Sequence, residues 1–198
     1  MAEMNDSFNE VTAEMLKVIS DYDSVTGFQG AYNIRQDSMC AGRKNSENIT
    51  IESKTDKPGI NIRIKPGTKG ETVYIPACVT HSNVDDLVYN DFFIGEGADV
   101  TIVAGCGVHS DGSETARHNG IHRFFLEKGA KVLYKEKHIG TGKGTGLRRI
   151  DPVTDAYLKE DSYLEMDTVQ LRGVDRTTRS TSAVLDKGAK IVVRERIM

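Results

Sequence analysis

The chain has 198 residues, a formal net charge of −3, three cysteines, 19 glycines and no tryptophan. This length suits one domain, and the slightly acidic balance argues against a nucleic-acid or anionic-membrane surface. Three cysteines cannot form a closed set of disulfides, no apolar run approaches a membrane span, and residues 1–8 do not resemble a signal peptide. We therefore expect a cytoplasmic protein that does not bind nucleic acid or membranes.

Residues 1–26 predict a short α-helix followed by a linker. The stretch from Ser7 to Glu10 fits a capping box, in which Ser7 would cap the helix and Glu10 would reach back to it. Apolar residues then recur at spacings of three and four: Phe8, Val11, Met15, Val18, Ile19 and Tyr22. We interpret this stripe as a packing face rather than as a partner-binding helix, and expect the helix to end between Tyr22 and Gly27.

From residue 27 onwards a repeat appears. The hexapeptide that begins at Gly97 is matched by those at Gly129 and Gly188, with fainter copies at Gly70 and Asp161. These starting positions are 27, 32, 32 and 27 residues apart. Each copy continues with Val, Ile, Thr or Tyr, which favour strands, and Gly is the residue that best tolerates the turn before them. A sixth, weaker copy is expected from Ser46, with Ile49 and Ile51 facing inwards.

Each repeat also has an incoming strand before its turn. Apolar residues alternate there at a period of two, and they are Phe92 and Ile94, Phe124 and Leu126, Ala156 and Leu158, and Ala183 and Leu185. No single repeat could bury enough apolar surface to fold alone, so neighbouring repeats must stack. Residues 27–198 are therefore predicted to form an all-β, right-handed parallel β-helix. A β-sandwich is the alternative, but it does not require like residues at a regular step.

Several segments, in order along the chain, resemble the SufB/SufD family of iron–sulfur cluster assembly proteins, in particular its compact archaeal and anaerobic members. These segments are Gly30–Arg35, Val88–Phe92, Ala104–His109, His118–His122, Glu136–Gly140 and Gly173–Arg179. The resemblance implies a non-enzymatic scaffold that assembles clusters with a SufC-like ABC-type ATPase and a like SufB/SufD subunit. It does not separate a SufB-like from a SufD-like role.

The resemblance also implies a longer protein, because family members continue past the position of Met198 with further coils and a helical tail. We expect the chain to be either a shortened form or a natural short form. Its last predicted strand, residues 191–197, lacks a polar cap, and an open strand edge favours pairing with another chain. A homodimer is therefore expected.

Cysteine and histidine residues supply the candidate ligands. A Cys-x-x-His spacing occurs twice and a His-x-x-x-His spacing once, which gives Cys78, His81, Cys106, His109, His118 and His122. Counted from the turn glycine, Cys106 and His138 occupy the same ninth place and Cys78 falls one place earlier, so stacking would align them along one edge. Thiolate and imidazole bind zinc, iron or an iron–sulfur cluster. The alternative is structural, because Cys is often a buried small apolar residue.

No catalytic residue is predicted. The Gly-rich stretch of residues 138–146 lacks the spacing of a phosphate-binding P-loop and is interpreted as a turn between coils. The charged cluster of Asp175, Arg176 and Arg179 is interpreted as a solvated face. Two other functions remain open: an interaction β-helix without a metal role, and a carbohydrate-active β-helix enzyme, which usually carries a secretion signal and acidic catalytic groups in a groove.

Overall fold

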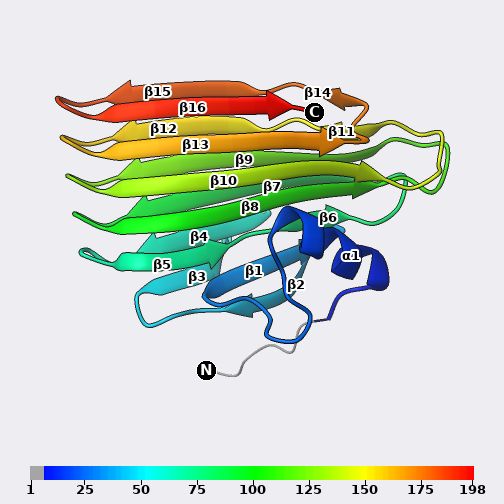
Figure 1. Cartoon of the computed structure of the whole chain (residues 1–198), viewed down its shortest axis with the longest axis horizontal. Helices are drawn as coiled ribbons and strands as arrows, with labels where there is room; N and C mark the ends of the chain where they lie inside the picture. Colours follow the sequence, from blue (N-terminus) through cyan, green and yellow to red (C-terminus); the bar gives the residue numbers. More distant parts are fainter. Residues whose placement is uncertain (1–6) are drawn as a thin grey trace.

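The computed structural model describes residues 7–198 as two facing eight-stranded sheets with one helix packed on the outside (Figure 1). Residues 1–6 of the expected N-terminal segment lie outside the described residues. The first sheet contains β1 (Ala31–Gln36), β2 (Met39–Lys44), β5 (Lys69–Tyr74), β6 (Ala77–Val79), β8 (Asp99–His109), β10 (Lys131–Thr141), β13 (Tyr163–Arg172) and β16 (Lys190–Ile197). The second contains β3 (Ile49–Ser53), β4 (Gly59–Ile64), β7 (Asp85–Ile94), β9 (Ala116–Leu126), β11 (Arg148–Ile150), β12 (Val153–Leu158), β14 (Arg176–Thr177) and β15 (Ser180–Leu185).

The repeats stack as parallel neighbours, which confirms the predicted solenoid. In the first sheet β8, β10, β13 and β16 pair in this order, so the segment from Gly97 lies beside that from Gly129, followed by those from Asp161 and Gly188. In the second sheet Ile94, Leu126, Leu158 and Leu185 share one register position. The chain therefore passes alternately through the two sheets and encloses one interior (Figure 1).

The turns between the sheets use the left-handed conformation that the glycines predict. Gly97 and Gly129 both have φ +64°, and Gly188 has φ +73°. Asp161, the non-glycine member of the series, takes φ +56° at the same place, a conformation that Asp tolerates better than most residues. A residue with a positive φ angle thus marks each place where the chain passes from one sheet to the other.

The N-terminal end departs from the parallel pattern. β1 and β2 form an antiparallel hairpin, and β3 pairs antiparallel with β4. The expected sixth copy from Ser46 is therefore wrong as a parallel repeat, although Ile49 and Ile51 are buried as expected. In each of these two hairpins the chain returns within the same sheet instead of crossing to the opposite sheet. β2 and β3 are therefore the edge strands of the two sheets at this end of the solenoid.

Helix α1 (Glu10–Ile19) covers the outer face of the first sheet. Its N-cap is Asn9, whose side chain accepts a hydrogen bond from the Thr12 amide at 2.9 Å, and not Ser7 as the capping box predicted. The buried face includes Leu16, while Val18 is 40% exposed, so the apolar stripe is rotated relative to the expectation. Among residues 7–198, no helix is long and apolar enough to cross a membrane.

Two glycines of β8 allow this helix to approach the sheet. A Cβ at Gly105 would lie 2.5 Å from the Ile19 carbonyl oxygen, and a Cβ at Gly107 would lie 2.4 Å from the Met15 sulfur. Side chains at these positions would hold the helix away from the strand. The pair of glycines on either side of Cys106 therefore selects the docking place of α1.

Candidate metal centre

The interior changes from apolar to polar along the strands. Near the glycine turns the two sheets contribute aliphatic and aromatic side chains, including Phe92 and Phe124 stacked at 4.5 Å between ring centroids. Farther along the strands, inward positions carry Cys106 on β8, Glu136 and His138 on β10, and the paired histidines of β9, all buried. Polar groups enclosed in this way need hydrogen-bond partners or ligands, so this half of the interior is the part that could bind a metal ion.

In the described residues, Cys106, Glu136 and His138 form a group of three possible metal ligands. Cys106 and His138 are directly opposite each other on adjacent strands, and the sulfur, one imidazole nitrogen and one carboxylate oxygen all lie within 4.8 Å of one another. His138 Nε2 is 3.3 Å from Glu136 Oε1, without the geometry of a hydrogen bond, and it has no other partner. A buried imidazole nitrogen that makes no hydrogen bond, beside a thiol and a carboxylate, is a suitable start for a metal site.

Glu136 is held in place from three sides. Arg179 donates to Oε2 at 2.6 Å, Thr168 donates to the same oxygen at 3.3 Å, and Tyr134 donates to Oε1 at 3.0 Å. Burial favours the neutral acid, but His138 and Arg179 outweigh this effect and keep the pKa of Glu136 well below its usual range. The site therefore contains a fixed carboxylate anion. Arg179, interpreted from the sequence as part of a solvated face, is instead mostly enclosed.

The thiol of Cys106 is protonated in the metal-free protein. Burial raises its pKa well above the ordinary value, and the negative charge of Glu136 raises it further. Because a metal binds the thiolate, metal binding here would release the thiol proton. The three residues offer one sulfur, one nitrogen and one oxygen, a mixed set that suits iron or zinc.

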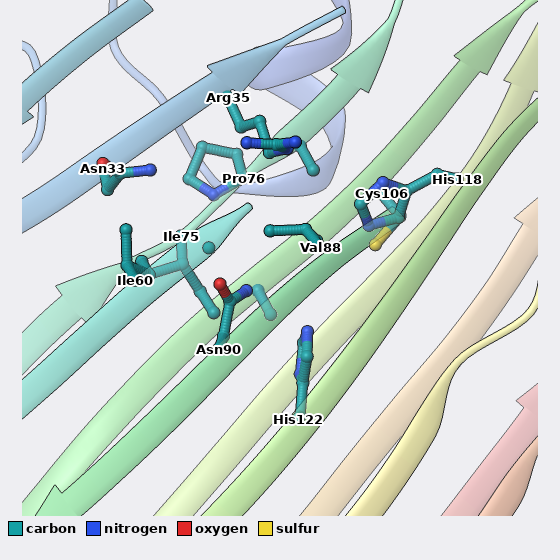
Figure 2. Close-up of a pocket in the computed structure, with 13 residues that line it drawn as sticks. Asn33, Arg35, Ile60, Ile75, Pro76, Val88, Asn90, Cys106, His118 and His122 are labelled. Carbon is teal, nitrogen blue, oxygen red and sulfur yellow. The ribbon is translucent and has the colours of Figure 1, made fainter. Parts of the chain in front are cut away.

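A second polar group lies across the interior on β9. His118 Nδ1 is 3.0 Å from Asp86 Oδ2, and Asp86 also pairs with Arg35 at 2.6 Å. His122 Nδ1 is 2.9 Å from the hydroxyl of Tyr134. Both histidines and Cys106 line a small cavity of about 20 Å³ (Figure 2). Burial lowers the pKa of His122 to about 4, so this imidazole is neutral near pH 7.

Cys78 lies in a different environment from Cys106. The residue opposite Cys106 is Ala77, because the register between β5 and β8 shifts between Lys69 and Thr72. Cys78 therefore faces outwards, where it is buried in the cluster formed by α1. Burial raises the pKa of its thiol. The structure thus brings Cys106 and His138 together and leaves Cys78 outside their group.

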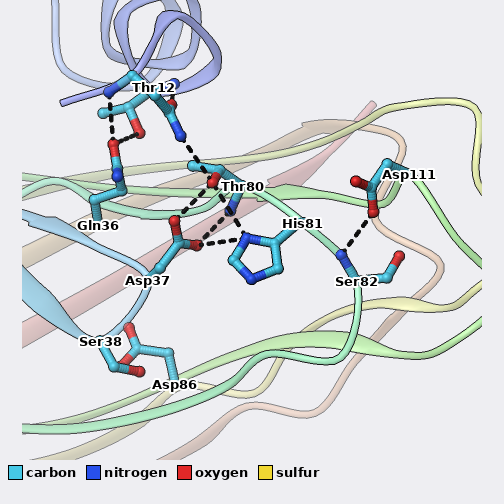
Figure 3. Close-up of polar contacts among 10 residues, drawn as sticks. Thr12, Gln36, Asp37, Ser38, Thr80, His81, Ser82, Asp86 and Asp111 are labelled. Carbon is cyan, nitrogen blue, oxygen red and sulfur yellow. Dashed lines mark hydrogen bonds and ion pairs between the residues drawn. The ribbon is translucent and has the colours of Figure 1, made fainter.

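His81 and His109 also lie outside the interior. His81 is exposed beside the loop that anchors the start of α1, with Nδ1 3.7 Å from Asp37 Oδ1, and Thr80 donates to Asp37 at 2.6 Å (Figure 3). His109 ends β8, where its Nδ1 is 2.9 Å from the Thr141 hydroxyl. Of the seven histidines and cysteines predicted as candidates, the interior therefore holds Cys106, His118, His122 and His138.

Glu136 is the main residue of the group that was not predicted. The sequence could have indicated Glu136, because alternate residues of a strand face the same side. If His138 faces the interior, Glu136 two positions earlier must face it too, like Val132 and Tyr134. Arg179 had no comparable signal, since it lies between two short strands and its side chain returns to the interior from a connection.

Comparison with known proteins gives three relatives, all called iron–sulfur cluster assembly SufBD family proteins. One from Methanothermobacter thermautotrophicus strain Winter is 32% identical over 89 residues, which is 44% of this chain and 21% of that protein. One from Archaeoglobus fulgidus is 33% identical over 98 residues, or 48% and 26%. One from M. thermautotrophicus strain Delta H is 30% identical over 89 residues, or 44% and 21%.

These alignments span about a fifth to a quarter of the length of the curated relatives. No protein-family model matches the chain, and no solved structure matches it. The same family name recurs in two archaeal genera, and the fold is the β-solenoid that the resemblance in the sequence implied. Together, the three matches support membership of this chain in the SufB/SufD family of iron–sulfur cluster assembly proteins.

Proposed function

We propose that this protein takes part in iron–sulfur cluster assembly, and that Cys106, Glu136 and His138 bind iron or a nascent cluster as transient cargo. Two observations carry the proposal: an imidazole nitrogen of His138, the Cys106 sulfur and a Glu136 oxygen lie within 4.8 Å of one another, and the buried His138 Nε2 makes no hydrogen bond. Three curated relatives named for iron–sulfur cluster assembly support the same reading.

The chemistry of the group fits a temporary occupant. Glu136 is already ionised and fixed, while Cys106 must lose a proton before it can bind metal. This cost weakens binding as the pH falls and favours release when the thiol is reprotonated. Three ligands leave at least one position of a four-coordinate iron open for sulfide or for a ligand from an acceptor protein.

The direct test is anaerobic reconstitution of the full chain with ferrous iron and sulfide, followed by iron analysis and absorption spectroscopy. Cys106→Ala and His138→Asn are expected to reduce bound iron and the sulfide-to-iron charge-transfer absorption at least tenfold. Cys78→Ala is the matched control, because it removes a buried thiol on the opposite face of the same sheet. Equal iron content in Cys106→Ala and Cys78→Ala would refute the assignment.

We further propose that the chain acts as a cytoplasmic scaffold rather than as an enzyme, with a SufC-like ATPase and a like SufB/SufD subunit as partners. The basis is the family similarity and a fold of two long sheets that offers extended surfaces. Co-purification with the ATPase tests the first partnership, and light scattering tests the homodimer. A strict monomer that does not retain the ATPase at micromolar concentrations would remove both partners.

A further inference from the structure

A groove runs along α1 on the outer face of the first sheet. It has a volume of about 450 Å³ and lies between the helix and the ends of β8, β10 and β13. The helix lines it with Val11, Met15 and Val18, and Ile139 of β10 adds a fourth apolar side chain. Met15 and Ile139 are buried, whereas Val18 is exposed. This volume and this apolar lining are typical of sites that bind small organic ligands.

A β-bulge turns Arg172 towards the groove. His138 pairs with Gln170, and the next residue of β10, Ile139, pairs with Arg172. Leu171 is therefore the extra residue of β13 at this place. Without it, Arg172 would face the interior, because it follows the inward Gln170 by two positions. The bulge instead places Arg172 beside Ile139, where its exposed side chain lines the groove.

The charge of Arg172 is not balanced within the described part of the chain. Its guanidinium makes no hydrogen bond or ion pair with residues 7–198, whereas the guanidinium of Arg148 pairs with Asp175 at 2.8 Å. Glu10 and Glu14 line the groove from the side of α1, but neither pairs with Arg172. The groove thus has an acidic edge on the helix and a free cation at the end of β13.

Polar side chains surround Arg172 at this end of the groove. His109 and Thr141 line the groove as well, and His109 Nδ1 is 2.9 Å from the Thr141 hydroxyl. The same three residues line a second hollow of about 660 Å³, which continues over the Gly-rich loop. Two cations, Arg172 and Lys143, line this hollow together with one carboxylate, that of Asp111. The polar end of the groove is therefore positively charged.

We propose that the groove binds a small organic anion with an apolar body. The anionic group lies against Arg172, and the apolar body lies along the valines of α1. A guanidinium binds carboxylate and phosphate through charge-assisted hydrogen bonds, and the glutamates of α1 repel the anionic group from the helix. The inference does not rest on the proposed function, because Cys106, Glu136 and His138 do not line the groove.

The test is a titration of the full chain with 2-naphthoate and with 2-naphthyl phosphate, followed through the methyl signals of ¹³C-labelled valine and isoleucine. The two probes share an apolar body and differ in the anionic group, so their relative affinities identify the preferred group. We expect saturable shifts at Val11, Val18 and Ile139. Val184 is the matched control, because it is an exposed valine on the other sheet. Shifts confined to Val184, or no shifts with either probe, would overturn the proposal.

The role of charge is tested with 2-naphthylmethanol, an uncharged probe of similar shape. We expect it to bind about tenfold more weakly than the better anion, because it makes no charge-assisted hydrogen bond with Arg172. Equal affinity for the alcohol and for both anions would contradict the proposal.

A charge variant supplies the last measurement. Arg172→Gln is expected to weaken binding of the anions about tenfold and to leave the affinity for the alcohol unchanged. Arg196→Gln is the matched control, since Arg196 is also an exposed arginine of the first sheet and pairs with Asp167. Equal affinities of the two variants for the anions would overturn the proposal. Arg172 has no partner among residues 7–198, so its replacement should leave the fold intact, which the methyl spectrum of the free variant checks.

Discussion

Cys106 and His138 are register partners on neighbouring parallel strands, at the place where the interior changes from apolar to polar. The two residues are 32 positions apart in the sequence, which is one full coil of the solenoid. Their proximity therefore depends on the stacking of the coils and not on a local motif. Any change that shifts β10 by one residue relative to β8 would turn His138 outwards and separate the pair.

The ion pair of Glu136 and Arg179 is predicted to be essential for stability as well as for the site. Glu136→Gln leaves the enclosed guanidinium of Arg179 with Glu195 as its remaining partner, so we expect a loss of about 3 kcal/mol in the free energy of unfolding. The measurement is urea denaturation near pH 7. Glu165→Gln is the control, because its partner Arg194 is exposed, and the expected loss is under about 1 kcal/mol. Similar losses for both variants would contradict this account.

The two glycines under α1 are predicted to differ in their tolerance of alanine. Gly105→Ala meets the backbone oxygen of Ile19, which cannot move without the helix, whereas Gly107→Ala meets the flexible side chain of Met15. We expect Gly105→Ala to cost at least about 2 kcal/mol and Gly107→Ala clearly less.

Displacement of α1 should also expose Cys78. We therefore expect its thiol to react with an aromatic disulfide reagent at least tenfold faster in Gly105→Ala than in the wild type, while the rate for Cys106 stays low. Cys40→Ala serves as the background, since Cys40 is only partly buried. An unchanged rate at Cys78 together with an unchanged melting temperature would show that α1 does not depend on Gly105.

The stability of the fold should depend on Asp91 in a pH-dependent way. Burial opposes ionisation of Asp91, but hydrogen bonds from Arg123 and Lys54 outweigh it and lower its pKa below the ordinary 3.8. The carboxylate therefore stabilises the folded state above about pH 4, and this contribution is lost as the pH falls through the lowered pKa.

Asp91→Asn tests this dependence. We expect the variant to lose about 3 kcal/mol near pH 7, because the enclosed ammonium of Lys54 loses its counter-ion, and this loss should shrink as the pH falls below about 4. Denaturant unfolding at several pH values measures the difference. A penalty that stays constant from pH 7 to pH 2 would mean that ionisation of Asp91 is not its cause.

Much of the fold can be predicted from the sequence, because similar residues recur at nearly regular intervals. The glycines at 97, 129 and 188 mark turns with a positive φ, and counting from them aligns Cys106 with His138 correctly. Cys78 was misplaced for a physical reason: the register irregularity near Lys69 is not visible in residue types, and it turns Cys78 to the face that α1 covers. The inward orientation of Glu136 could be predicted, because alternate residues of a strand face the same side. The position of Arg179 could not be predicted in this way, because Arg179 lies in a connection that has no periodic pattern.

The most direct test of the central claim is X-ray absorption at the iron edge after loading with ferrous iron alone, in the double variant Cys40→Ala/Cys78→Ala. With no sulfide added, Cys106 is the one cysteine left of three that can supply a thiolate sulfur at about 2.3 Å from the iron. We predict one such sulfur neighbour together with nitrogen and oxygen neighbours, and its loss on adding Cys106→Ala. An iron environment of oxygen and nitrogen only, the same with and without Cys106, would contradict the account.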